Sequence, residues 1–357
     1  MNPPVDRRMV SVAKAIGILF VVAGHIPGIG FFPFLPYTFH IPLFYFLSGL
    51  VFNPSTYLGY PIIFIRCRIR SLLLPYFAYN IIFASITAGC KVWPGISFES
   101  QRWNVARMLF VEPFISGHQY MLFAPGWFLC SLFLVGLAYL FIARMLERFL
   151  VREPLRFFFF CTLAVVGMEY GRLAPESKFF NHYLNMVIAK NLIGLFFFYL
   201  GGRFREVANL ACLRDSRIMV LAIAVQIYCI THYAANFSTA MNNYPSIPSS
   251  LLTSLCGITF VIFVSTRLAH SDQARDGWLI SIGEQSLHVL ACHLFVFHLL
   301  NIMFLAWHGE SLQILSREFY YVYDPQRFWL VYLCAGIGVP TVLAIWANRL
   351  RGVLVPR

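Results

Sequence analysis

Two ionisable residues, Lys14 and His25, lie in the first long apolar segment of the chain, at residues 9–26. They are eleven residues apart, which on an α-helix is about three turns and about 16 Å, so both side chains share one helix face. An ionisable group inside an apolar span is costly in lipid and is a functional candidate by default. The structural alternative is that Lys14 extends to the membrane interface and His25 caps the outer end of the helix.

A second histidine, His40, begins the next apolar segment, at residues 39–53, a short distance along the chain from His25. Two histidines at one depth of a membrane can form a base and its orienting partner. They can also bind a metal, but two histidines without a nearby acidic or thiolate ligand are a weak metal signal. We therefore expect a catalytic pair and no metal.

Three arginines, Arg66, Arg68 and Arg70, directly precede the third apolar segment. Positive residues beside a span orient it in the membrane, and that role needs no further explanation. A guanidinium cluster near Lys14 would also hold the phosphates of a cytoplasmic donor. The two interpretations are compatible, and both remain open at this point.

Two later apolar segments carry further polar side chains. Trp127 lies in one of them, and His288, His293 and His298 recur at five-residue intervals in another, so the three imidazoles spiral around a helix. Each is better interpreted as a polar packing contact than as a catalyst, and Glu284 is one turn from His288 and able to pair with it. The chain has no GxSxG, HExxH, Walker or GxGxxG motif, which argues against a hydrolase of the usual kind and against an ATP-driven pump.

The composition requires lipid around most of the chain. Of 357 residues, 59% are hydrophobic and 12% are charged, and the mean hydropathy is +0.70, which polar residues cannot cover in water. Apolar runs of about 20 residues predict an all-α polytopic membrane protein, a bundle of about ten transmembrane helices in a single domain over residues 1–357. No cleavable signal follows the first segment, so we expect it to remain as a helix. The expected spans lie near 9–26, 39–53, 71–90, 120–142, 157–172, 187–202, 218–234, 249–266, 279–305 and 328–347.

The net charge of +12 at pH 7 is better explained by membrane orientation than by nucleic acid. Lys and Arg residues gather in alternate connections between the expected spans, and such residues mark the cytoplasmic side. We expect a bacterial inner-membrane protein with both termini in the cytoplasm and no nucleic-acid partner. The nine cysteines include no CxxC pair and mostly lie in apolar runs, which predicts neither disulfides nor zinc. The aromatic residues of the outer loops form either an interfacial belt or a stacking surface for sugar rings.

Several of these stretches, in this order, resemble the acyltransferase 3 family of integral membrane acyltransferases, and within it the branch that O-acetylates bacterial surface and exported glycans. The resemblance extends over residues 7–300, and its most specific part is a basic residue, Lys14, separated by ten residues from His25. Many members have Arg at the position of Lys14 and Asp at that of Ser11, so no role for that acid carries over. The other matching stretches are 39–44 with 48–49, 70–76, 127–129, 282–283 with 286–287, and His293.

The resemblance implies that acetyl-CoA binds from the cytoplasmic side and that its acyl group reaches a sugar hydroxyl. His25 would be the general base that removes the hydroxyl proton, a task that suits an imidazole at neutral pH. His40 would orient His25 or contact the acceptor. Lys14, with Arg68 or Arg70, would neutralise the phosphates of coenzyme A.

The same resemblance implies a substrate site that includes Ser48, Trp127, Ser286 and His293. The expected partners are a polysaccharide or lipid-linked oligosaccharide acceptor and the membrane lipids. Direct transfer and transfer through a covalent histidine intermediate both remain open.

Export of a glycan or its lipid-linked precursor by a membrane transporter is the alternative function, because histidines in helices also suit proton relays. A transporter would spread polar groups over many spans. Here they concentrate in the first, second and ninth expected spans, which favours a local site and therefore an enzyme.

Overall fold

The computed structural model describes residues 6–90, 105–117, 120–149, 151–173, 182–207, 215–233, 237–269, 277–318 and 320–354. Within these residues the chain forms helices and their connections, with two isolated β-bridges and no strand, which confirms the predicted all-α fold class. A π-helical segment, η2 (Ile69–Leu73), joins α4 to α5, and 3-10 segments η1 (Pro36–Thr38) and η3 (Met121–Gly126) precede α2 and α8. The α-helices are α1 (Arg7–Gly24), α2 (His40–Leu50), α3 (Pro54–Tyr57), α4 (Pro61–Arg68), α5 (Leu74–Cys90), α6 (Val105–Phe110), α7 (Glu112–Ile115), α8 (Trp127–Arg148), α9 (Glu153–Leu173), α10 (His182–Val207), α12 (Ser216–His232), α13 (Ile247–Leu268), α14 (Trp278–Glu284), α15 (Ser286–Trp307), α16 (Ile314–Arg317) and α17 (Pro325–Leu354).

Six helical stretches among the described residues are long and apolar enough to cross a membrane, so the chain is a polytopic membrane protein. Each of the other four expected spans also overlaps a helix, namely α1, α2, α9 and α12, but these helices are shorter or less apolar. The total of ten spans therefore stays a prediction. The six stretches are Pro61–Gly89, Met121–Arg148, His182–Glu206, Ile247–Leu268, Ser286–Trp307 and Pro325–Leu350.

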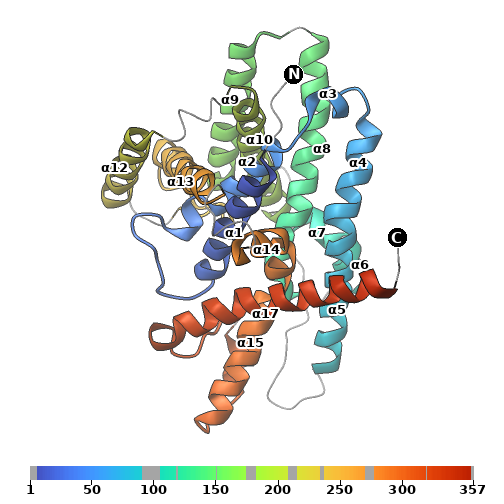
Figure 1. The fold of residues 1–357 in the computed structure, drawn as a ribbon, viewed down its shortest axis with the longest axis vertical. Helices are drawn as coiled ribbons and strands as arrows, with labels where there is room; N and C mark the ends of the chain where they lie inside the picture. The colour runs from blue at the N-terminus through green and yellow to red at the C-terminus, as the bar shows by residue number, and fades with distance from the viewer. Residues whose placement is uncertain are drawn as a thin grey trace.

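The ninth expected span, 279–305, is not one continuous helix. The backbone at Gln285 leaves the helical region, with φ −94° and ψ 11°, and this residue separates α14 from α15. The break matters because it lets the short helix α14 lie against α1 while α15 packs on α17. In Figure 1, α17 runs across the direction of α8 and α10.

Helix α1 begins and ends where its sequence dictates. The Asp6 carboxylate accepts hydrogen bonds from the backbone N–H groups of Arg8 and Met9, which satisfies two of the free donors at the helix start. The helix stops at Gly24, with His25 as the C-cap, because Pro27 cannot continue it and Gly28 turns the chain with φ +76°. His25 is thereby held at the end of the helix opposite the N-terminus.

Helix α1 lies in the middle of the helical body, where it packs against α2, α13, α14, α15 and α17 (Figure 1). Val12, Ala13, Val22 and Ala23 are completely inaccessible. Burial of this helix on several sides explains why it is apolar over most of its circumference. Ser11 and Lys14 are therefore partly buried among neighbouring helices, whereas Arg7 and Arg8 at the start of α1 are exposed.

Helices α2 and α10 cross so closely that only glycine fits at the contact. A Cβ atom added at Gly49 would lie 1.8 Å from the Phe198 carbonyl oxygen, and one added at Gly201 would lie 1.9 Å from the Phe46 carbonyl oxygen. Small residues at such crossings let helix backbones approach in a membrane. The two glycines thus set the position of α10 relative to the helix that carries His40.

We expect Gly201→Ala to destabilise the protein by roughly 1–3 kcal/mol, because a backbone carbonyl cannot move aside as a flexible side chain would. Gly338→Ala in α17 is the matched control, since a Cβ atom there would meet nothing within 4 Å and alanine favours the helix. Thermal unfolding of the two detergent-solubilised variants checks this. Equal midpoints for Gly201→Ala and the wild type would contradict the close crossing.

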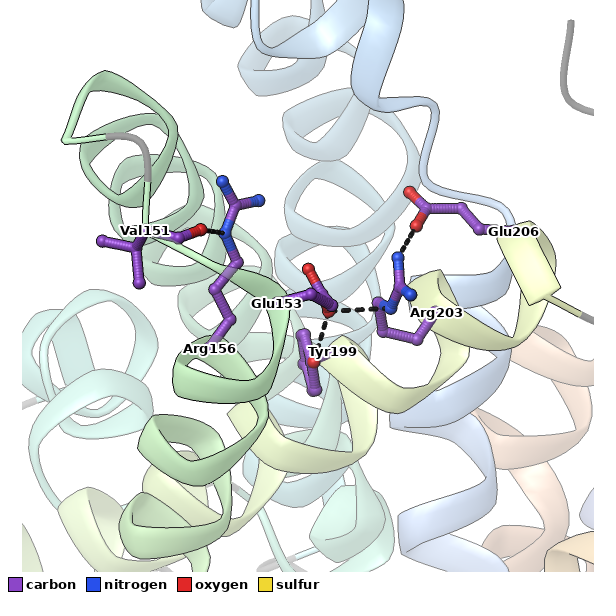
Figure 2. Close-up of polar contacts among 6 residues, drawn as sticks. All are labelled: Val151, Glu153, Arg156, Tyr199, Arg203 and Glu206. Atoms are coloured by element: carbon purple, nitrogen blue, oxygen red, sulfur yellow. Dashed lines mark hydrogen bonds and ion pairs between the residues drawn. The ribbon is translucent and has the colours of Figure 1, made fainter.

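A polar cluster joins α9 to the far end of α10, as Figure 2 shows. Glu153 Oε1 accepts a hydrogen bond from the Tyr199 hydroxyl at 2.6 Å and lies 2.7 Å from Arg203 Nε, while Arg203 also pairs with Glu206. The charged side chains are about one third exposed, at 32–36%. Partly exposed pairs of this kind contribute about 0–1 kcal/mol, so the cluster orients the helix ends more than it stabilises the fold.

Candidate functional site

The His25 ring is held in one orientation by its own helix. Its Nδ1 atom lies 2.8 Å from the Val21 carbonyl oxygen. Because a carbonyl oxygen can only accept, Nδ1 carries the proton and Nε2 keeps its lone pair in the neutral ring. His25 therefore presents an unprotonated nitrogen, the form that a general base requires.

His40 is oriented by the same kind of contact and lies close to His25. It is the first residue of α2, its side chain is buried, and its Nδ1 donates to the Pro36 carbonyl oxygen at 2.5 Å. The Tyr37 ring packs between the two histidines, with centroid distances of 6.3 Å to His25 and 5.4 Å to His40. The turn that contains η1 thus brings together the two histidines of the predicted catalytic pair.

His293, on α15, lies behind His25. Its Nδ1 donates to the Val289 carbonyl oxygen at 2.9 Å, so its Nε2 is an acceptor, and this Nε2 lies 3.4 Å from His25 Nδ1. The two ring centroids are 5.0 Å apart, and His293 is completely buried. The structure therefore places His293, expected at the substrate site, where it can orient His25, the place that the sequence suggested for His40.

A cavity of about 550 Å³ opens beside the two histidines. Its walls come from the end of α1, the η1 turn, α2, η3, the start of α8, and α10. His25, His40 and Trp127 all line it, as does Tyr320, whose ring centroid is 5.8 Å from that of His25. The cavity is largely aromatic and apolar, and it offers a small number of polar groups at fixed positions, as ligand sites commonly do.

Lys190 is a cavity residue that the sequence did not single out. It projects from α10, and its Nζ lies 4.5 Å from the centroid of the Trp127 ring. The signal that would have identified it is present, because Lys190 is an ammonium group within an apolar helix and such groups are functional candidates.

Ser48 and Ser286, both expected to contact the substrate, do not line this cavity in the described part of the chain. Their stretches have a packing role. Gly49, next to Ser48, forms the crossing with α10, and a Cβ atom at Gly283 would lie 1.8 Å from the Ser11 carbonyl oxygen. The short segment that contains Gly283 and Ser286 therefore packs closely against the backbone of α1.

Three charged residues lie close together near the middle of α1. Lys14 is close enough to Arg68 to be repelled by it and to Glu284 to be attracted by it. The Arg68 guanidinium also lies over the Phe64 ring at 5.1 Å, whereas Arg70 is exposed. Lys14 and Arg68 are therefore brought together as expected, and Glu284 joins them from α14.

The sequence offered His288 as the partner of Glu284. In the structure the His288 Nδ1 atom lies 2.5 Å from the Tyr79 hydroxyl of α5. The break at Gln285 places Glu284 on α14 and His288 on α15. Glu284 is instead close enough to Lys14 to attract its ammonium group. Helical spacing across this break is thus not a guide to contact.

Candidate metal ligands and cysteines are the other groups relevant to chemistry within the described residues. No group of three or more His, Cys, Asp or Glu side chains there is arranged to hold a metal ion. The seven cysteines whose side chains are described are free thiols. Cys90 and Cys212 lie outside that description.

A scan against family models matched residues 10–346 to the family described as Acyltransferase domain (acyltransferase 3). The match covers essentially the whole chain, including Lys14, His25, His40, His293 and Lys190. A search of the curated proteins and a search of the solved structures found no match.

Proposed function

Because the chain belongs to the acyltransferase 3 family of membrane acyltransferases, we propose that it moves an acetyl group from acetyl-CoA to a hydroxyl of an exported polysaccharide or its lipid-linked precursor. His25 is the general base in this proposal. The observation that supports this role best is the lone pair on His25 Nε2 beside a cavity of about 550 Å³, with Nδ1 engaged by the Val21 carbonyl.

In the proposed reaction, His25 Nε2 takes the proton of the acceptor hydroxyl as the hydroxyl oxygen attacks the thioester carbonyl carbon. The new C–O bond forms, the C–S bond breaks, and the sulfur leaves as a thiolate. The imidazolium of His25 returns its proton to that thiolate, so the products are an O-acetyl ester and coenzyme A. Transfer is direct, and the acceptor and donor meet at the same histidine.

Lys14 and Arg68 bind the phosphates of the donor in this proposal. Lys14 lies near the middle of α1, about 16 Å along the helix from His25, and Arg68 lies close enough to Lys14 to repel it. A donor with anionic phosphates at one end and a reactive thioester at the other matches that separation of charge and base. We place the Lys14 end and both termini on the cytoplasmic side of the bacterial inner membrane, where acetyl-CoA is made.

Membrane vesicles with and without the protein test the proposed activity. Vesicles that contain it should transfer label from radiolabelled acetyl-CoA to glycan, and mass spectrometry of surface glycans from a deletion strain should show the loss of the ester. Labelled glycan that crosses the membrane without becoming acetylated would instead support the rival function, export. No transfer to any endogenous glycan would contradict the proposal.

His293 is a positioning residue in this proposal, because it contacts His25 rather than the cavity. We expect His293→Leu to lower kcat by about tenfold with little change in either KM, since an apolar side chain removes the polar contact of His293 Nε2 with His25 Nδ1, whose proton is shared with the Val21 carbonyl oxygen. His293→Gln keeps an acceptor oxygen and should restore most of kcat. Equal losses in both variants would indicate a packing role alone.

A further inference from the structure

Lys190 is a cavity residue that the proposed reaction does not use. It lines the same cavity as His25 and His40, and its Nζ lies 4.5 Å from the centroid of the Trp127 ring. It is the ninth residue of α10, about 12 Å along the helix from His182. The proposed acyl transfer would proceed without a cation here, so the presence of this ammonium group in the cavity needs another explanation.

Among the described residues, the cavity offers no counterion for this ammonium group. None of the described lining residues is an Asp or a Glu, and no carboxylate in that part of the chain lies at ion-pair distance from Lys190. A cation in a mostly apolar cavity is costly unless it is paired. The Trp127 ring compensates only in part, because cation–π contacts are weaker than a desolvated ion pair.

The position of Lys190 is fixed by its neighbours on α10. Asn191 accepts a hydrogen bond from Ser131 of α8 at 2.5 Å, and Ser131 is in turn 2.5 Å from the Tyr45 hydroxyl of α2. Ala189 on the other side is completely buried. These contacts set the rotation of α10, so Lys190 points to the cavity and is not free to turn away from it.

From this arrangement we propose that the acceptor is anionic, and that Lys190 binds a carboxylate or phosphate of the acceptor while His25 faces the hydroxyl to be acylated. This inference rests on the proposed function and names its substrate class. The aromatic rings of Trp127 and Tyr37 supply flat apolar surfaces for the sugar between the two polar ends. The cavity would then select by charge as well as by shape.

The anionic group can belong to the sugar itself, as in a uronic acid, or to the phosphate that links a sugar to its lipid carrier. Two pairs of probe acceptors distinguish these sources. The first pair is methyl glucuronide and methyl glucoside, which differ in a sugar carboxylate. The second pair is a polyprenyl-phosphate-linked glucose and an alkyl glucoside, which differ in the phosphate of the anchor.

The experiment uses the full chain in lipid nanodiscs and measures kcat/KM for each probe with labelled acetyl-CoA. In the wild type we expect the charged member of at least one pair to be preferred by about tenfold or more, as a charge-assisted contact provides. Lys190→Met should bring that ratio close to one, and Lys190→Arg should keep it. Arg327→Met, which removes a cation that stacks on Phe328 instead, should also keep it.

Binding of the same probes, measured by calorimetry without acetyl-CoA, keeps the test independent of catalysis. Charged probes that bind the wild type and Lys190→Arg about tenfold more tightly than Lys190→Met support the anion site even if no transfer occurs, in which case the proposed function alone fails. Transfer without any preference for the charged probes would overturn the anion site and leave the acyltransferase intact. Charged probes that bind wild type and Lys190→Met equally would overturn it as well.

Discussion

Replacement of His25 by alanine is expected to lower acetyl transfer by about 10²–10⁴-fold, the contribution of a positioned general base. The variant should still be inserted in the membrane and bind acetyl-CoA, because the donor phosphates are assigned to Lys14 and Arg68, about three helical turns from His25. Label transfer from acetyl-CoA in vesicles, normalised to the amount of protein, measures the effect. Retention of more than about one tenth of the wild-type rate would remove His25 from the role of base.

His308→Ala is a close control for this substitution. His308 ends α15 as His25 ends α1, with the same backbone angles, φ −91° and ψ 3°. Its Nδ1 donates to the Phe304 carbonyl oxygen at 2.8 Å, yet its side chain is exposed and does not line the cavity. A loss in His25→Ala that His308→Ala does not share therefore reports the chemistry of the site and not the loss of a helix-end contact.

Replacement of Lys14 by methionine is expected to raise KM for acetyl-CoA by about 10–100-fold, the value of one charge-assisted contact to a phosphate, with a smaller change in kcat. Lys14→Arg preserves the charge and should stay within a few-fold of the wild type. Arg8→Met removes an exposed cation from the same helix and is the control. Initial rates over a range of acetyl-CoA concentrations separate KM from kcat.

Glu284 is expected to increase the effect of the Lys14→Met substitution on KM. Its carboxylate attracts the Lys14 ammonium group, whereas the Arg68 guanidinium repels it. Loss of Lys14 removes the positive charge nearest this carboxylate at the proposed phosphate site, which adds repulsion of the anionic donor. An unchanged KM in Lys14→Met would show that the donor binds elsewhere and that this charge group serves only the packing of α1 and α14.

The sequence was most informative where the relevant contacts lie within one helix. Lys14 and His25 were predicted to share a face of one helix, and α1 carries Lys14 and ends at His25. His40 was predicted near His25 because only a short turn separates them. The prediction of a membrane protein followed from composition, since no arrangement of so few polar residues can cover the chain in water.

The sequence was least informative where helices far apart in the chain meet. His293 approaches His25 across 268 residues, whereas its spacing in the sequence favoured a packing histidine and the family resemblance implied a substrate contact. The predicted pairing of Glu284 with His288 assumed a continuous helix, whereas the chain breaks at Gln285. Gly283 and Gly49 looked like parts of motifs, and only the backbone contacts reveal why no larger residue fits.

By itself, the sequence determined the helical fold class, the membrane environment and the pairing of a cation with an imidazole along α1. Those properties depend on composition and on the period of a single helix, both of which are local. Only the tertiary structure decided that His293 lies behind His25 and that Lys190 enters the cavity. These placements depend on how α10 and α15 rotate and cross against α1 and α2, and the spacing of residues within one helix carries no information about its rotation relative to another.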